Sequence, residues 1–142
     1  MGELTVHTGA WTLDDRFASP WHYLPVEVAP GTAALRVELE YERAGAAVLD
    51  LGCLGPSGFR GWSGGARESF VIAAEAATPG YLPGEIEPGL WQVVIGLHML
   101  PADGVRYRVT AEPSTGPAAD HAVAPAPPAP ATRPARRELP AA

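Results

Sequence analysis

Apolar and polar residues alternate with a period of two along two segments of the chain. In residues 33–41 (AALRVELEY), leucine, valine and tyrosine alternate with arginine and glutamate. Residues 104–112 (GVRYRVTAE) repeat the pattern, with arginine, threonine and glutamate at the polar positions. Because the side chains of a β-strand point alternately to its two faces, this period predicts strands with one buried and one solvated face.

Four further segments have the composition of strands without the same alternation. Residues 68–73 (ESFVIA) and 90–98 (LWQVVIGLH) are apolar on both faces, which predicts more central positions in a sheet. Residues 22–28 (HYLPVEV) and 46–54 (AAVLDLGCL) are weaker candidates. Pro25 lacks a backbone N–H, so the strand that contains it is expected at the edge of a sheet.

Short turn sequences rich in glycine and proline separate these segments. No window shows a sustained helical period together with capping residues, so no helix is predicted. About six short strands with such turns predict an all-β protein, an antiparallel β-sandwich or jelly roll that forms a single domain. The turn sequences are APGT (29–32), RAGA (43–46), TPG (78–80), EPG (87–89) and PADG (101–104).

The composition changes after Glu112. Residues 113–142 contain eight of the 16 prolines, one glycine and no aromatic residue. A segment with so little apolar surface cannot offset the entropy of ordering its backbone. We therefore predict a β-sandwich domain over residues 1–112 and a disordered, Pro/Ala-rich linker or tail over residues 113–142. Because a linker joins two parts, we also expect the chain to be a fragment of a longer protein.

Charge and composition bear on the partners and the location of the protein. The net charge of −6 over 142 residues argues against nucleic acid, because binding phosphates requires a basic surface. The apolar run VVIGLHML (93–100) is far shorter than the roughly 20 residues that span a bilayer. The first residues carry acids where a secretory signal has an apolar run. We therefore expect a cytoplasmic protein with neither nucleic acid nor membrane as a partner.

Residues 61–65 (GWSGG) match the G-x-S-x-G pattern of the nucleophile elbow in serine hydrolases. That elbow needs a turn from a strand into a helix, whereas a strand is predicted directly after this motif. The acid and the base would have to be Glu87 and His98, in a chain too short for that fold. A glycine-rich loop that matches by chance is the preferred interpretation. A self-contained hydrolase with Ser63 as its nucleophile is the least favoured function.

Residues that bind metals are not clustered along the sequence. No two of the four histidines lie within five residues of each other, so the spacing of a local metal site is absent. A site assembled across strands from His22, Asp14 and Asp15 is the alternative that stays open. We expect no metal, no cofactor and no catalytic residue on this chain. The single cysteine, Cys53, lies among apolar residues, so we expect a buried and unreactive thiol.

Aromatic residues and arginines lie close together in the middle of the chain. Trp62 stands between glycines in a predicted loop, where burial against its own domain is hard to arrange. Exposed aromatic rings beside arginines are typical of binding surfaces. The alternative is that Trp62 closes the end of its own sandwich while the arginines pair with acids of the same domain. The candidate interaction residues are Arg60, Trp62, Arg67 and Tyr81.

Five stretches of the sequence together carry a resemblance to a known family. They are WTLDDRF (11–17), PWHYLPVEV (20–28), LDLGCLGPSGFRGWSGGAR (49–67), ATPGYLPGEI (77–86) and PGLWQVVIGLH (88–98). In this order they resemble the N-terminal accessory domain of bacterial PHP-type metallohydrolases, the CehA/McbA group. The resemblance spans residues 9–112, and GFRGWSGGAR and ATPGYLPG are its most specific parts.

The resemblance implies both a fold and a partner. In that family the domain is a β-sandwich, followed by a linker and the PHP catalytic domain, whose His, Asp and Glu residues bind divalent metals for phosphoester hydrolysis. This sequence contains no His-x-His, so no catalytic residue of the family carries over. The implied role is a non-catalytic accessory domain that interacts with the PHP catalytic domain or supports a homo-oligomer. The alternative is a carbohydrate- or small-ligand-binding module, because jelly rolls with exposed tryptophans commonly bind sugars.

Overall fold

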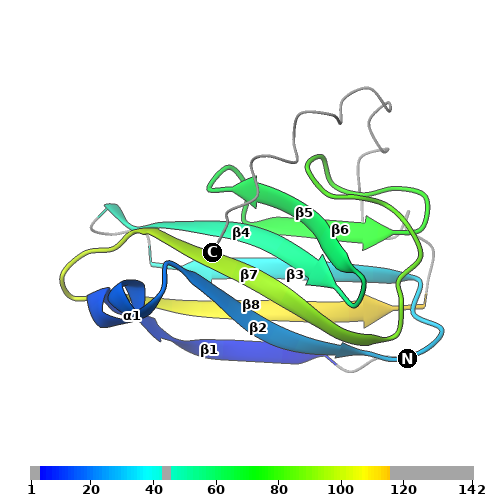
Figure 1. The fold of residues 1–142 in the computed structure, drawn as a ribbon, viewed down its shortest axis with the longest axis horizontal. Helices are drawn as coiled ribbons and strands as arrows, with labels where there is room; N and C mark the ends of the chain where they lie inside the picture. The colour runs from blue at the N-terminus through cyan, green and yellow to red at the C-terminus, as the bar shows by residue number, and fades with distance from the viewer. Residues whose placement is uncertain (1–3, 43–45, 116–142) are drawn as a thin grey trace.

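The computed structural model describes residues 4–42 and 46–115, which form two antiparallel sheets packed face to face (Figure 1). Sheet A has the strand order β1-β8-β3-β6, and sheet B, in front of it in Figure 1, has the order β2-β7-β4-β5. The elements are β1 (Thr5–Trp11), α1 (Leu13–Ala18), β2 (Trp21–Val28), β3 (Ala34–Tyr41), β4 (Val48–Gly55), β5 (Gly58–Gly64), β6 (Ser69–Ala73), β7 (Gly89–Met99) and β8 (Val105–Ser114).

The strand order is that of a jelly roll. β1 pairs with β8, β2 with β7, β3 with β6 and β4 with β5, so the first four strands pair with the last four in reverse order. β8 also pairs with β3, and β7 with β4, which joins the four pairs into two sheets. An eight-stranded double sheet with this winding is the jelly-roll form of a β-sandwich. The prediction of an all-β sandwich is therefore confirmed.

Alternate residues of the strands fill the core between the sheets. β3 buries Leu35, Val37 and Leu39 and turns its charged residues outward, as the period of two predicts. Trp91 of β7 is fully buried, and β7 lies inside sheet B as its two-sided apolar composition predicts. β2, which contains Pro25, lies at the edge of the same sheet as predicted.

The prediction that the chain forms no helix is wrong at residues 13–18. The side chain of Thr12 accepts a hydrogen bond from the backbone N–H of Asp15, and the Asp15 carboxylate accepts one from the N–H of Thr12. This capping box satisfies backbone donors at the start of α1. The helix buries none of its residues, so it has no apolar stripe that the sequence could reveal. Strand β1 also lies outside the predicted strands, because threonine, histidine and glycine interrupt its apolar positions.

Residues 58–64 form strand β5, so the interpretation of this region as a glycine-rich loop is wrong. β5 pairs with β4 at the edge of sheet B, and two register shifts leave Arg60 and Ser63 without a paired residue on β4. These irregularities break the period of two. The inward position between them is Gly61, where a Cβ would overlap the ring of Tyr81. The alternation that signals a strand is therefore hidden in the sequence.

Strand β6 lies at the edge of sheet A, which corrects the prediction of a more central position. Its outward residues Val71 and Ala73 pack with Ala34 in a small apolar cluster of their own. The chain that follows β6 folds back along it, because the N–H of Thr78 donates to the carbonyl of Val71 and the N–H of Val71 donates to Thr78 Oγ1, both at 2.9 Å. Irregular backbone therefore covers this edge, which explains why β6 is apolar on both faces.

The segment after β6 also reaches sheet B. The N–H of Trp62 donates to the carbonyl of Gly80 at 3.1 Å, and the N–H of Leu82 donates to the carbonyl of Arg60 at 2.9 Å. The segment that spans residues 76–82 thus bonds to the edge strand of each sheet. It closes one side of the sandwich and joins the two layers there.

Strand β8 extends to Ser114, two residues beyond the domain boundary that the composition predicts. β1 pairs with β8 only as far as Ala111, so Pro113 lies where β8 has a partner on one side, a position that tolerates proline. Residues 116–142, which hold most of the predicted tail, lie outside the described residues. Within the described ranges, no helix is long and apolar enough to span a bilayer.

Candidate functional site

The outer face of sheet A is polar and charged. β3 and β8 place arginine and glutamate there in the polar positions of their period-two pattern. Arg36 pairs with Glu38 at 2.8 Å, and Arg106 donates to the Glu42 carboxylate through both Nε and Nη2. An antiparallel sheet with one face in the core ordinarily presents such a solvated face on the other side.

The outer face of sheet B, by contrast, is mostly apolar. The strand register and the burial of alternate residues in the core show which residues point outward. Tyr23 and Leu90 are 41% and 47% exposed there. We call this surface the sheet-B face. Its residues are Trp21, Tyr23, Pro25 and Glu27 of β2; Leu90, Gln92, Val94, Gly96 and His98 of β7; Val48, Asp50, Gly52 and Leu54 of β4; and Phe59 and Trp62 of β5.

Two glycines of the sheet-B face lie beneath tryptophan rings. A Cβ at Gly96 would overlap Cζ3 of Trp21 and lie 2.9 Å from its Cε3, and a Cβ at Gly52 would lie 2.5 Å from Cε3 of Trp62. Both rings therefore rest on bare backbone, and they meet edge to face with centroids 5.4 Å apart. Val94 is only 6% exposed although it points outward, so neighbouring side chains cover it. The result is an aromatic and apolar platform across the four strands.

One carboxylate, that of Asp50, is set into this platform. Asp50 lies on β4 opposite Gly96, and its side chain is 13% exposed. Its ionisable neighbour is His98, whose Nδ1 lies 4.0 Å from Asp50 Oδ2. Burial among apolar groups disfavours the charged form and raises the pKa of Asp50, an effect that the charge of His98 partly opposes. Asp50 and His98 are the polar groups at one end of the sheet-B face.

We expect Asp50→Asn to stabilise the domain at neutral pH. Because the pKa of Asp50 is higher in the folded state than in the unfolded state, its ionisation opposes folding. The gain from asparagine should be absent below about pH 4, where the unfolded carboxyl also takes up a proton, and should be complete above the folded pKa. Thermal unfolding as a function of pH measures the difference, with Glu38→Gln as the control at an ion-paired carboxylate of sheet A. A lower Tm for Asp50→Asn at neutral pH would contradict this expectation.

The structure gives Arg60 a structural role and not the predicted role at a partner's surface. Its guanidinium donates to the carbonyls of Leu82, Gly84 and Glu85 at 3.0–3.4 Å. Its Cζ also lies 4.8 Å from the centroid of the Trp91 ring. Partial burial lowers the pKa of Arg60. The Arg60 guanidinium therefore holds the backbone of residues 82–85 against the sandwich.

Tyr81, another predicted interaction residue, belongs to the core. It is 1% exposed, and its ring stacks on Phe70 with centroids 4.1 Å apart. Its hydroxyl donates to the carbonyl of Leu51 at 3.2 Å and lies 2.7 Å from Ser63 Oγ. Burial raises the pKa of the Tyr81 hydroxyl far above its usual range. Tyr81 therefore presents no surface to a partner.

The two remaining predicted interaction residues, Trp62 and Arg67, stay accessible. Trp62 is half-buried on the sheet-B face, so it neither stands free in a loop nor closes the end of the sandwich. Arg67 is exposed, and within the described part of the chain it forms no hydrogen bond or ion pair. The structure thus separates the four predicted residues into two that stabilise the fold and two that remain open to binding.

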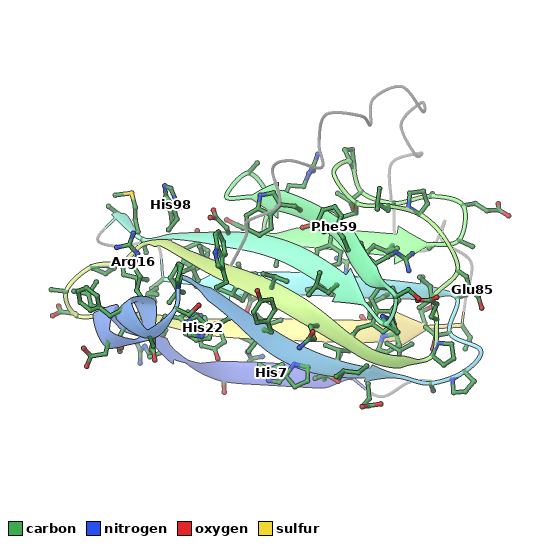
Figure 2. All side chains as sticks on the ribbon, in the orientation of Figure 1. His7, Arg16, His22, Phe59, Glu85 and His98 are labelled. Atoms are coloured by element: carbon green, nitrogen blue, oxygen red, sulfur yellow. The ribbon has the colours of Figure 1, made fainter. Side chains whose placement is uncertain are left out.

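The residues of the predicted hydrolase alternative lie far apart. Ser63 contacts the hydroxyl of Tyr81 on a sheet edge, while Glu87 accepts a hydrogen bond from Ser57 at 2.8 Å. His98 lies at the α1 end of the molecule, and Glu85 lies at the opposite end (Figure 2). Strand β7 separates Glu87 from His98 by about 30 Å at the rise of a β-strand. These groups form no nucleophile, base and acid in contact.

The predicted metal alternative has its groups engaged elsewhere. His22 Nε2 lies 2.8 Å from the carbonyl of Ser19, and the Asp15 carboxylate caps α1. Among residues 4–42 and 46–115, no three His, Cys, Asp or Glu side chains are grouped so that they could hold a metal ion. The prediction of a buried thiol is confirmed, because Cys53 is 1% exposed and burial raises its pKa to about 12.

Trp21, Tyr23 and Asp50 belong to one surface that the sequence does not predict. Trp21 and Tyr23 lie two residues apart on β2, but Asp50 lies on β4, and only the pairing of both strands with β7 brings the three onto one face. One signal was present in the sequence, because residues 90–98 are apolar on both faces. That pattern reflects a buried inner face and, on the outer side, the apolar platform.

A comparison with protein-family models and with curated proteins found no match to this chain.

Proposed function

We propose that this chain is a non-catalytic accessory domain of a PHP-type metal-dependent phosphoesterase and that it binds the PHP catalytic domain through the sheet-B face. The proposal assigns metal binding and hydrolysis to the catalytic domain and assigns binding alone to this chain. It includes a cytoplasmic location, with neither nucleic acid nor membrane as a partner.

The observation that carries the proposal is the difference between the two outer faces. Sheet A turns ion-paired arginines and glutamates to the outside, whereas sheet B turns two tryptophans, a tyrosine and several aliphatic residues outward. Contiguous exposed apolar surface on a folded domain is a mark of an interaction site. Tryptophan and tyrosine near the centre of such a surface are the side chains that contribute most to binding between proteins.

Two further observations support the proposal. The jelly roll agrees with the β-sandwich that the resemblance implies for the accessory domain. Trp62, the central residue of the most specific motif of the resemblance, lies on the sheet-B face. The other features of that motif, Gly61 and Arg60, hold β5 and the following segment in place. The motif therefore builds the strand that presents Trp62.

The test is binding of this chain to a PHP-type catalytic domain prepared without an accessory domain of its own. We expect Trp62→Ala to weaken binding about thirtyfold, the effect of removing an aromatic side chain from the centre of an interface. Because the ring is half-buried, the variant should also lose about 1 kcal/mol of unfolding free energy. Titration calorimetry measures the affinity, and thermal unfolding shows that the variant is folded at the assay temperature.

Arg108→Ala is the matched control, because Arg108 points outward from sheet A at a position paired with Glu40. Its substitution should leave the affinity unchanged. Equal binding by Trp62→Ala and the unaltered chain would show that the sheet-B face is not the docking surface. The chain could instead associate with itself through this face, which light scattering would detect as a dimer. If Trp62→Ala abolishes that dimer, the partner is a second copy of the chain and not the catalytic domain.

A carbohydrate-binding module is the second candidate, and one observation favours it. The Trp21 ring lies over Gly96, opposite Asp50, and meets the Trp62 ring edge to face. A sugar ring is bound by aromatic stacking together with hydrogen bonds to polar side chains. Titration with a panel of neutral oligosaccharides, followed by tryptophan fluorescence, tests this function. Saturable binding that Trp62→Ala abolishes would favour it over docking to a catalytic domain.

A further inference from the structure

Among the carboxylates of the described residues, Asp50 combines low exposure with the lack of a hydrogen-bond donor, whereas the other carboxylates without a donor are exposed. Glu38 and Glu42 are 43% and 46% exposed, and each accepts hydrogen bonds from an arginine. The Asp50 side chain is only 13% exposed, yet within residues 4–42 and 46–115 no N–H or O–H group donates to it. A half-buried carboxylate without donors costs stability. Its surroundings therefore leave a strong acceptor unsatisfied beside the aromatic platform.

Two glycines lie beside this carboxylate. Gly96 lies opposite Asp50 on β7, and Trp21 lies across that glycine. On the other side lies Gly65, where a Cβ would be in van der Waals contact with Asp50 Oδ1 at 3.5 Å. His98 is 63% exposed, and its Nδ1 lies 4.0 Å from Asp50 Oδ2, beyond hydrogen-bond distance.

We propose that Asp50, together with the Trp21 and Trp62 rings, binds a guanidinium group of an arginine side chain on the docking partner. This inference rests on the proposed docking function and adds the chemistry of the contact. A guanidinium is planar, so it can donate two parallel hydrogen bonds to a carboxylate and stack on an aromatic ring at the same time.

The charge of the chain favours a cation at this site over a neutral ligand. The sequence has a net charge of −6, so its field attracts a positive group. A cation near a tryptophan ring also gains from the negative face of the π system, which a sugar hydroxyl does not. A lysine ammonium carries the same charge, but it is not planar, so it cannot stack on an aromatic ring while donating two parallel hydrogen bonds to a carboxylate.

The experiment uses N-acetyl-L-arginine amide as the probe and follows the indole N–H signals of the four tryptophans by NMR. We expect saturable shifts at Trp21 and Trp62, with the fully buried Trp91 as an internal reference. The citrulline analogue has the same shape without the charge and should bind about tenfold more weakly or not at all. Asp50→Asn, which should fold and gain stability, should weaken binding of the arginine probe by about tenfold.

Glu40→Gln is the matched control. Glu40 is exposed on the outer face of sheet A, opposite Arg108, so this variant changes the net charge equally while it leaves Asp50 and the sheet-B face intact. Its affinity for the probe should match that of the unaltered chain. Equal binding of the citrulline analogue, or equal loss in Glu40→Gln and Asp50→Asn, would overturn the guanidinium site. Shifts of the same indoles with maltose and none with the arginine probe would also overturn it, in favour of a sugar.

The docking assay separates this inference from the function on which it rests. If Trp62→Ala weakens docking to the catalytic domain and Asp50→Asn does not, the guanidinium site is wrong and the docking function stands. If neither variant weakens docking, both are wrong. If both variants weaken docking and Glu40→Gln does not, both are supported.

Discussion

Replacing Gly61 with alanine should cost about 4 kcal/mol or more and leave the domain largely unfolded at physiological temperature. Gly61 has a φ of +150°, which side-chain-bearing residues rarely adopt. Its Cβ would also overlap the Tyr81 ring and lie 2.7 Å from the Tyr81 Cα. Because the contact involves backbone, no side-chain rotation relieves it. The register of β5, and with it the position of Trp62, depends on this close approach.

Gly58→Ala is the control that measures the cost of a positive φ alone, without a steric overlap. Gly58 also has a positive φ, +131°, but a Cβ there would meet no atom within 4 Å. The control should therefore lose only the cost of an unfavourable conformation, about 1–2 kcal/mol. Chemical denaturation of both variants gives the comparison. Equal losses in the two variants would show that the approach of Tyr81 to β5 is not what requires glycine at position 61.

Replacing Arg60 with methionine should cost about 3 kcal/mol, the second-largest effect that we expect. Methionine keeps the packing of the side-chain stem, but three carbonyls after residue 81 lose the guanidinium that donates to them. Those carbonyls belong to the segment that closes the side of the sandwich. Arg60→Lys should recover little of the loss, because one ammonium cannot replace a planar fork with several donors. Denaturation measured by circular dichroism checks both variants.

Arg67→Met is the comparison that separates stability from binding. Arg67 is exposed, so its replacement should leave the free energy of unfolding within about 0.5 kcal/mol of the original. Equal stability of Arg60→Met and Arg67→Met would mean that Arg60 does not hold the following segment in place. The expected contrast would confirm that two arginines seven residues apart in one motif serve different purposes.

Asp50 and Arg60 show how this domain divides its polar groups between stability and binding. Arg60 finds all its acceptors within the chain, whereas Asp50 finds no donor among the described residues. Substituting Arg60 should therefore destabilise the domain, while substituting Asp50 should stabilise it. A group that lowers stability where it stands is a candidate for function, because binding sites retain strained or unsatisfied groups that folding alone would not select.

The sequence by itself determined the fold class and, for several strands, which side chains are buried. The period of two in 33–41 and 104–112 identified β3 and β8, and Pro25 identified an edge strand, because these signals depend on neighbouring residues along one strand. The buried states of Cys53 and Trp91 were predictable for the same reason. Where local signals were weak or broken, as in α1 and β5, the predictions were wrong.

Only the tertiary structure decided which residues form a surface. Trp21, Asp50 and Trp62 lie on three strands of one sheet, and the jelly roll brings them together through pairings between distant parts of the chain. The same pairings buried Tyr81 and turned Arg60 onto its own backbone, although both appear in the sequence as candidates for binding. An aromatic or arginine side chain can serve a core or an interface equally well. Whether such a side chain lies in the core or at an interface depends on the neighbours that the fold places around it. Those neighbours come from distant parts of the chain, so the local sequence does not predict them.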